Sequence, residues 1–272
     1  MVNITCNFNW QSQEVIPFFL EGESAQELYS QTEGIRTGHM QYDPNTKLVS
    51  GSTLFLAARV DTLVRPLGLR VVNLRDLSRP EVMKLIQDKY YTDAPALVVR
   101  SETDPNYPKN NRLIRRILDQ ASRFNPKFPF MVTGFDAVQL EDKEGYGIDI
   151  VARDDFQVTE DERLLGKCSC SEFSDVDEQG FPLFDRKGSR TWYARDKGLS
   201  GLCLVSSLDA NSSVDDLAGS GDGGRVVLIS GAATSQKNFE QYLTRLKQEA
   251  DKQKAEVDTR FSKARRVLLG EE

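Results

Sequence analysis

The sequence predicts a mixed α/β fold in which a β-α-β-α-β portion is followed by antiparallel strands and a long C-terminal helix. Three observations predict it. Short apolar runs alternate with amphipathic segments between residues 69 and 135, strand-like runs separated by turn sequences follow, and a highly charged segment without glycine or proline occupies residues 235–269. Alternating strands and helices are typical of a parallel sheet, whereas closely spaced strands are typical of hairpins.

The alternating portion begins with the β-branched run "LRVVNL" at residues 69–74. The next segment, "SRPEVMKLIQDKYY", has Ser78 as a candidate N-cap and Pro80 in the first helical turn, where a missing N–H does no harm. A second strand, "APALVVR" at 94–100, precedes the helix "RLIRRILDQASRF" and a third strand, "FPFMVTGF". We therefore expect right-handed crossovers and a parallel core sheet.

The segment that ends at Pro66 predicts short strands, two helices and a loop. "VNITCNF" and "EVIPFFL" have the composition of strands, and Pro17 places the second near a sheet edge because proline cannot donate a ladder hydrogen bond. Ser24 is the candidate N-cap of a short helix over 25–31. The polar tract 33–52 is expected to be a loop, and "STLFLAARVDTLVRP" a largely buried helix that ends at its proline.

Beyond residue 135 the strand-like runs become short and frequent. They are separated by turn sequences such as "DEQG", "RKGS" and "SGDGG", which favour hairpins over crossovers. We therefore expect antiparallel pairing in this half of the chain. The runs are "DAVQL", "YGIDIVA", "RLLGKCSC", "RTWYAR", "LSGLCLVSSL" and "GRVVLIS".

The C-terminal segment predicts a helix separate from the globular part, so we divide the chain into a domain at 1–234 and a helix at 235–272. Apolar residues recur in this segment mostly at alternating steps of four and three, which is the seam pattern of a coiled coil. Such a helix is not stable alone and needs a partner face. We expect it to mediate self-association or docking to a protein partner, or to pack back on its own sheet. The candidate interaction residues are Phe239, Leu243, Leu246, Ala250, Val257 and Leu268.

Composition argues against several function classes. The chain has 272 residues, a formal net charge of −6 and a pI of about 5.1, which disfavours wholesale attraction to nucleic acid or to an anionic membrane. No apolar run approaches the length of a membrane span, and the N-terminus lacks the features of a signal peptide, so we expect a cytoplasmic protein. Four cysteines in a chain of this length fit free thiols in a reducing compartment.

One stretch suggests metal chemistry. "GIDIVA" at 147–152 resembles the first element of the Mrr-like core of restriction-type endonucleases, which implies a metal ligand at Asp149. The second element of that core carries Glu or Gln two residues before a lysine, but Lys167 follows Leu165 and Gly166. A divalent ion needs at least two oxygen ligands, and the spacing of Cys168 and Cys170 does not fit a zinc site. We therefore expect two ordinary strands, no metal and no cofactor.

The helix "RLIRRILDQASRF" offers a basic face. Arg112, Arg116 and Arg123 lie opposite its apolar stripe, and such a face could follow the phosphates of a nucleic acid. Asp119 lies among these arginines at a spacing that permits ion pairs, so a salt-bridged, solvated face is the competing interpretation.

No family is recognised across the chain, and the chemical signals are each incomplete. The sequence favours a non-catalytic structural or interaction protein that self-associates or docks through its C-terminal helix. The alternative is a nucleic-acid-binding protein or a degenerate Mrr-like, metal-dependent nuclease.

Overall fold

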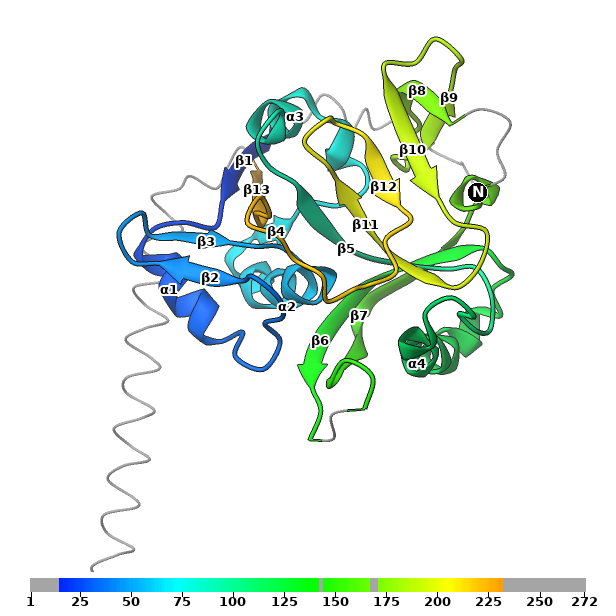
Figure 1. Cartoon of the computed structure of the whole chain (residues 1–272), viewed down its shortest axis with the longest axis horizontal. Coiled ribbons are helices and arrows are strands. Elements are labelled where there is room, and N and C mark those ends of the chain that lie inside the picture. Colours follow the sequence, from blue (N-terminus) through cyan, green and yellow to red (C-terminus); the bar gives the residue numbers. More distant parts are fainter. Residues whose placement is uncertain (1–14, 142–143, 167–170, 232–272) are drawn as a thin grey trace, which may run out of the picture. The chain divides into compact units, whose positions relative to one another are not determined.

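The structure is a computed structural model that describes residues 15–141, 144–166 and 171–231. All of them belong to the first of two units into which the chain divides, residues 1–232. In this part of the chain, three β-sheets and four α-helices build the fold (Figure 1). None of the described helices combines the length and the apolar character that crossing a membrane requires.

The largest sheet has eight strands in the spatial order β7-β6-β5-β11-β12-β10-β8-β9. Neighbouring strands are antiparallel except β10 and β12, which run parallel. The central strands β5 and β11 are almost entirely buried. The strands are β5 (Thr92–Val99), β6 (Phe130–Gln139), β7 (Ile148–Glu160), β8 (Glu172–Val176), β9 (Pro182–Phe184), β10 (Arg190–Ala194), β11 (Leu199–Leu204) and β12 (Ala210–Ser212).

The predicted parallel β-α-β-α-β sheet is wrong. β5 and β6 are neighbours, but they pair antiparallel, with Leu97 opposite Val132. The first strand of the predicted unit, β4 (Leu69–Val71), lies in a different sheet, antiparallel to β13 (Val227–Gly231). A connection long enough for a parallel crossover is also long enough for an antiparallel return, and strand composition does not encode strand direction.

Two small sheets complete the set. One has the order β1-β13-β4, and Pro17 of β1 (Val15–Phe19) lies in an edge strand of this sheet, as expected. The other is a hairpin of β2 (Gln41–Asp43) and β3 (Leu48–Ser50) within residues 33–52, which we expected to be a loop. Strands of three residues are too short for an alternating pattern to show in the sequence.

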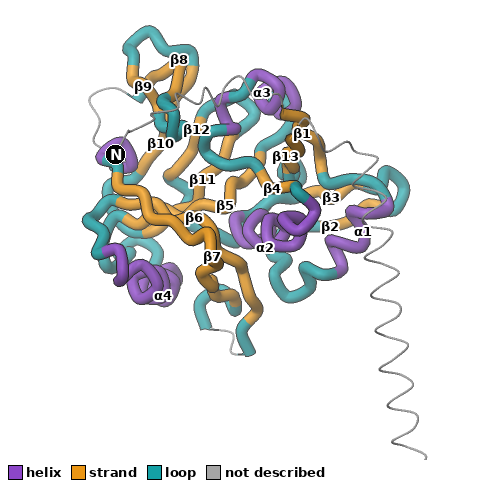
Figure 2. The backbone as a smooth tube through the Cα atoms, turned by 180° about the vertical axis from the view of Figure 1, so that it is seen from behind, coloured by secondary structure: helices purple, strands orange, loops and turns teal. Residues whose placement is uncertain are grey.

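Two helices pack on the large sheet (Figure 2). Helix α2 (Leu54–Val64) contacts β5 and β6, and helix α4 (Asn111–Ala121) contacts β7. Their apolar stripes join Phe130, Val132 and other strand residues in one hydrophobic core. Each fully buried side chain of this size contributes about 1.5–3 kcal/mol to stability relative to an exposed one, so the sheet and the helices depend on each other.

The predicted helix before Pro66 is confirmed as α2. Its N-cap is Thr53, whose Oγ1 accepts a hydrogen bond from the Leu56 N–H at 3.1 Å. The two N-caps that the sequence predicted, Ser24 and Ser78, are wrong. Helix α1 (Glu23–Ser30) begins after Gly22 and not after Ser24, and helix α3 (Pro80–Ile86) has Arg79 as N-cap in place of Ser78. Short 3-10 helices span Arg65–Leu67, Asp76–Ser78, Pro108–Asn110, Ser122–Phe124 and Glu162–Leu164.

Antiparallel strands beyond residue 135 are confirmed in most places, with three corrections. "DAVQL" is not a separate strand but the end of β6, "RLLGKCSC" begins with a 3-10 helix, and β10 pairs parallel with β12. Leucines at 164 and 165 resemble a strand in composition, yet Asp161 caps a helical turn there by accepting a hydrogen bond from the Arg163 N–H. Residues 167–170 lie outside the described part of the chain.

The predicted fold class also included a long C-terminal helix. Residues 235–272 lie outside the described residues, and the described helices, of at most 11 residues, give no support to such a helix. The division of the chain at residue 234 stays a prediction. The candidate interaction residues also lie outside the described part: Phe239, Leu243, Leu246, Ala250, Val257 and Leu268.

Candidate functional site

The large sheet curves around a cleft of about 520 Å³. β7 and the β8–β9 hairpin belong to opposite ends of the strand order, yet Gln157 of β7 and Gln179 of the hairpin turn both line this cleft. Side chains that alternate along β6 and β7 divide the two faces: Val132 enters the core, whereas Met131 and Thr133 face the cleft. Helix α2 and the segment after β4 form the remaining walls.

Aspartates and arginines form a network at one end of the cleft. Asp61 is buried at the end of α2, and its carboxylate accepts hydrogen bonds from Arg65, from Arg153 and from the Val71 N–H, at 2.8–2.9 Å. Asp155 pairs with the same two arginines, 2.7 Å from Arg65 and 3.0 Å from Arg153. Both aspartates that line the cleft are therefore neutralised by arginine.

The ion pairs hold the carboxylate of Asp155 in its charged form. Burial by itself would raise the pKa of Asp155, but the hydrogen bond from Arg153 and the positive charges of Arg153 and Arg65 lower this pKa below its ordinary value. Burial likewise lowers the pKa of Arg153, yet Asp155 and Asp61 outweigh this effect and raise it. These groups keep their charges across the neutral pH range.

Two further arginines, Arg70 and Arg75, line the cleft. A carboxylate neutralises the first of them but not the second. The guanidinium of Arg70 binds both carboxylate oxygens of Asp76, which is also paired with Arg79. Arg75 is exposed, and its side chain makes no ion pair with any residue in the described ranges. Arg75 is therefore the cation that an incoming ligand meets without displacing a protein carboxylate.

A β-bulge brings Arg153 and Asp155 to this network. Pairing between β6 and β7 shifts between Thr133 and Phe135, which leaves residues 153–156 of β7 without regular partners. Gly134 occupies the bulge with φ of +73°, and a Cβ atom there would collide with the main chain of Asp155. Bulges of this kind redirect side chains and are frequent beside functional sites.

A second glycine holds the segment that carries Arg75. Gly180, in the turn between β8 and β9, has φ of +91°, and a Cβ atom there would lie 2.6 Å from the Arg75 main-chain nitrogen. Asp177 fixes this turn, since its Oδ1 accepts hydrogen bonds from the N–H groups of Gln179 and Phe181 at 2.9 and 3.0 Å. The hairpin turn therefore packs directly against the main chain at Arg75.

The rest of the cleft is lined by buried apolar residues and by uncommitted polar groups. The apolar residues Ala94, Pro95, Ala96 and Met131 line the cleft, and all four are buried. The side chains of Gln157, Gln179, Thr133 and Thr159 make no hydrogen bond within the described residues, and all four remain accessible. The volume of this cleft lies within the range of small-molecule sites, and most of its accessible lining is polar.

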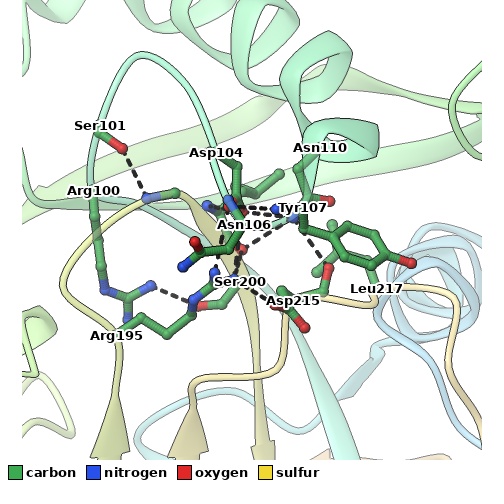
Figure 3. A network of polar contacts seen from close by, with 12 residues as sticks. Arg100, Ser101, Asp104, Asn106, Tyr107, Asn110, Arg195, Ser200, Asp215 and Leu217 are labelled. Carbon is green, nitrogen blue, oxygen red and sulfur yellow. Dashed lines mark hydrogen bonds and ion pairs between the residues drawn. The ribbon is translucent and has the colours of Figure 1, made fainter.

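The polar network around Asp104 lies outside the cleft and has a structural role (Figure 3). Asp104 is completely buried, and its carboxylate accepts hydrogen bonds from the N–H groups of Asn106, Tyr107 and Leu199, and from the side chains of Asn110 and Arg195. All of its acceptor positions are occupied by the protein. The network fastens the loop after β5 to the start of α4 and to β11, and both carboxylate oxygens of Asp104 are occupied by the protein.

Two of the three arginines of the predicted basic face lie beside carboxylates. Arg112 pairs with Glu144 at 2.9 Å, and Arg116 lies 3.4 Å from Asp149. The guanidinium of Arg123 lies 4.8 Å from the centre of the Phe124 ring. Nucleic-acid binding through these arginines stays a prediction, as does the competing salt-bridged face.

The nuclease-like stretch forms one edge of the sheet. Asp149 is in β7, where its Oδ1 accepts a hydrogen bond from the Ile150 N–H and its Oδ2 faces Arg116. In the ranges that the structure describes, no group of three or more His, Cys, Asp or Glu side chains is arranged to hold a metal ion. Lys167, Cys168 and Cys170 lie outside those ranges.

The residues of the cleft were not predicted from the sequence. One signal was available: residues 65–79 contain four arginines and one aspartate in a chain whose net charge is −6. The four are spaced by four or five residues, so neither a helical nor a strand period makes them a single face. The fold brings three of them, Arg65, Arg70 and Arg75, to one cleft, with a turn at Gly68 between the first two.

Comparison with known proteins gives no relative that could assign this cleft. No family model matches the chain, and neither a curated protein nor a solved structure is significantly similar to it.

Proposed function

We propose that the protein is a non-catalytic binding protein whose cleft holds a small organic anion. The proposal rests on which charged side chains of the cleft already have a partner of opposite charge. Three arginines face two aspartates, both aspartates are already paired with arginine, and Arg75 has no carboxylate partner among the described residues. A ligand with an anionic group would supply that partner, whereas a cationic ligand would meet no free carboxylate.

The paired aspartates also argue against acid–base catalysis in the cleft. A general acid or base needs a pKa near the working pH. The pKa of Asp155 is lowered, and Asp61 is held by two guanidinium groups and a main-chain N–H. Both carboxylates hold arginines in place, which supports a role in binding.

Titration calorimetry of the full chain tests the proposal. We expect citrate or ribose 5-phosphate to bind saturably with one site per chain, and glucose, a neutral control, not to bind. Arg75→Glu should weaken binding of the anions at least about tenfold, because a charge-assisted hydrogen bond contributes about 1.5–3 kcal/mol.

Arg186→Glu is the matched control, since Arg186 is exposed, lies outside the cleft and gives the same change in net charge. Its affinity for the anions should equal that of the unchanged protein. Absence of binding by any anion, or equal weakening in the two variants, would contradict the proposal.

A further inference from the structure

We infer that helix α4 caps the outer edge of β7 through Gln120 and so prevents this edge from pairing with the same strand of a second copy of the chain. β7 is the last strand of the large sheet, and β6 is its one strand neighbour among the described residues. A strand of 13 residues at a sheet edge presents main-chain groups that can pair with another strand. The capped segment, residues 148–152, lies outside the cleft.

The carboxamide of Gln120 takes the place of a residue in a neighbouring strand. Its Nε2 donates a hydrogen bond to the Ile150 carbonyl at 2.9 Å, and its Oε1 accepts one from the Ala152 N–H. These two main-chain groups belong to alternate residues of β7, so both point to the same edge, the one away from β6. A residue of a parallel strand would bond the same two groups with its own N–H and carbonyl. The side chain of Gln120 therefore satisfies this part of the edge as a strand would.

A second side chain caps the neighbouring main-chain donor on the same edge. The Ile150 N–H donates to Asp149 Oδ1 at 2.8 Å, and Asp149 Oδ2 lies 3.4 Å from Arg116. Arg116 and Gln120 are four residues apart, so they lie on one face of α4. One turn of this helix therefore serves both caps, and Asp149, in the stretch that resembles a nuclease core, has a role at the sheet edge.

Without these caps the edge suits self-association. Val151 lies between the two residues that Gln120 binds, and its side chain is 42% exposed. A two-fold axis joins identical surfaces of two copies, so the same segment of β7 would pair with itself in the antiparallel direction. Natural proteins suppress such pairing by covering exposed edges, and the contact between α4 and β7 provides this cover.

Sedimentation velocity of the full chain and of Gln120→Ala tests the inference. We expect the variant to self-associate at a protein concentration at least about ten times lower than the unchanged protein, because two main-chain hydrogen-bonding groups become available to a second chain. Gln87→Ala is the matched control, since Gln87 is exposed and lies outside every strand. Its self-association should equal that of the unchanged protein.

A second substitution locates the new contact on β7. Val151→Lys adds a charge to the edge, and like charges on paired strands repel each other. The double variant Gln120→Ala/Val151→Lys should therefore self-associate no more than the unchanged protein. Persistent association of the double variant would overturn the inference, as would equal association of Gln120→Ala and Gln87→Ala.

Hydrogen exchange of the unchanged protein tests the cap even if Gln120→Ala does not fold. The Ala152 N–H should exchange at least about ten times more slowly than in an unstructured chain, although it points away from β6. Exchange of this N–H at the rate of an unstructured chain would show that Gln120 does not hold it, and would overturn the inference. Anion binding in the cleft should be the same in Gln120→Ala, so this inference and the proposed function can fail separately.

Discussion

At the scale of single residues, the charged side chains of the cleft differ in whether a neighbour already neutralises them. Asp61 and Asp155 each contact two arginines, so they shape the site without being free to bind. Arg75 differs because its guanidinium has no carboxylate partner within the described residues, while Gly180 of the β8–β9 turn packs against its main chain. The same residue type therefore has a structural role at position 153 and a proposed binding role at position 75.

Asp93 in β5 provides a prediction about stability that is independent of the cleft. Its Oδ2 is enclosed and has no hydrogen-bond partner in the described structure, and burial raises the pKa of this carboxyl to about 6, although a hydrogen bond with Ser52 opposes the rise. In an unfolded chain the pKa of aspartate is about 3.9. Between these two values the unfolded chain ionises first, so Asp93 makes the folded state less stable as pH rises from about 4 to about 6.

Asp93→Asn should remove this loss, because the amide stays neutral. We expect the variant to exceed the unchanged protein in free energy of unfolding by about 1–3 kcal/mol at pH 7.5, and by little at pH 4. Urea unfolding at both pH values measures the difference. A variant that is less stable than the unchanged protein at pH 7.5 would show that the charged carboxylate stabilises the fold.

Single residues also show the limit of sequence reasoning about the site. The four arginines of 65–79 are visible in the sequence, but which of them is free is decided by Asp61, Asp76 and Asp155. Two of these aspartates lie in other elements of the chain. Ion pairing across the fold therefore could not be predicted from the local pattern of charges.

At the scale of elements, irregular features build the cleft. The bulge between β6 and β7 directs Arg153 and Asp155 toward α2, and the β8–β9 turn holds the segment after β4. Both features depend on a glycine with positive φ, at positions 134 and 180. A residue with a side chain at either position would strain the main chain and meet a neighbouring segment.

Gly180→Ala tests the link between the hairpin turn and Arg75. The added methyl group would lie 2.7 Å from the Leu74 carbonyl carbon, so the segment must shift and carry Arg75 with it. We expect stability to fall by about 1–3 kcal/mol and the affinity for the anionic probe to fall several-fold. Urea unfolding and calorimetry measure the two effects.

Gly221→Ala is the control for this substitution, because no atom lies within 4 Å of the position where its Cβ would be and its φ is not positive. Its stability should stay within about 0.5 kcal/mol of the original. Equal loss of affinity in both alanine variants, or full affinity in Gly180→Ala, would show that the turn does not position Arg75.

The elements themselves were more predictable than their arrangement. Strong local signals gave helices α2 and α4 and the central strands β5, β6 and β11, because a long apolar stripe or a dense β-branched run identifies the element by itself. Short strands such as β2, helix caps near Ser24 and Ser78, and the 3-10 turn near Leu164 were mispredicted, because one or two local contacts decide them. Strand direction depends on partners that are distant in the sequence, and this is why the parallel sheet was wrong.

At the scale of the whole molecule, a chain with a net charge of −6 contains a cleft whose lining has an excess of positive charge. Charges separated by more than about 8 Å are largely screened at physiological ionic strength, so the overall charge does not prevent a local anion site. Overall charge disfavours broad nucleic-acid or membrane attraction, which stays a prediction, and it could not reveal this site. The curvature of the eight-stranded sheet, which brings opposite ends of the strand order to one cleft, is a property of the assembled fold alone.

The most direct test of an anion-binding cleft follows the methionine methyl groups by NMR during a titration with ribose 5-phosphate or citrate. Met131 lies in the cleft, whereas Met40 and Met83 lie outside it and serve as controls within the same spectrum. We predict that the Met131 signal shifts to saturation while those of Met40 and Met83 stay in place, and that Arg75→Glu abolishes the shift. A Met131 signal that does not move for any anion, or that moves equally in Arg75→Glu, would contradict the account.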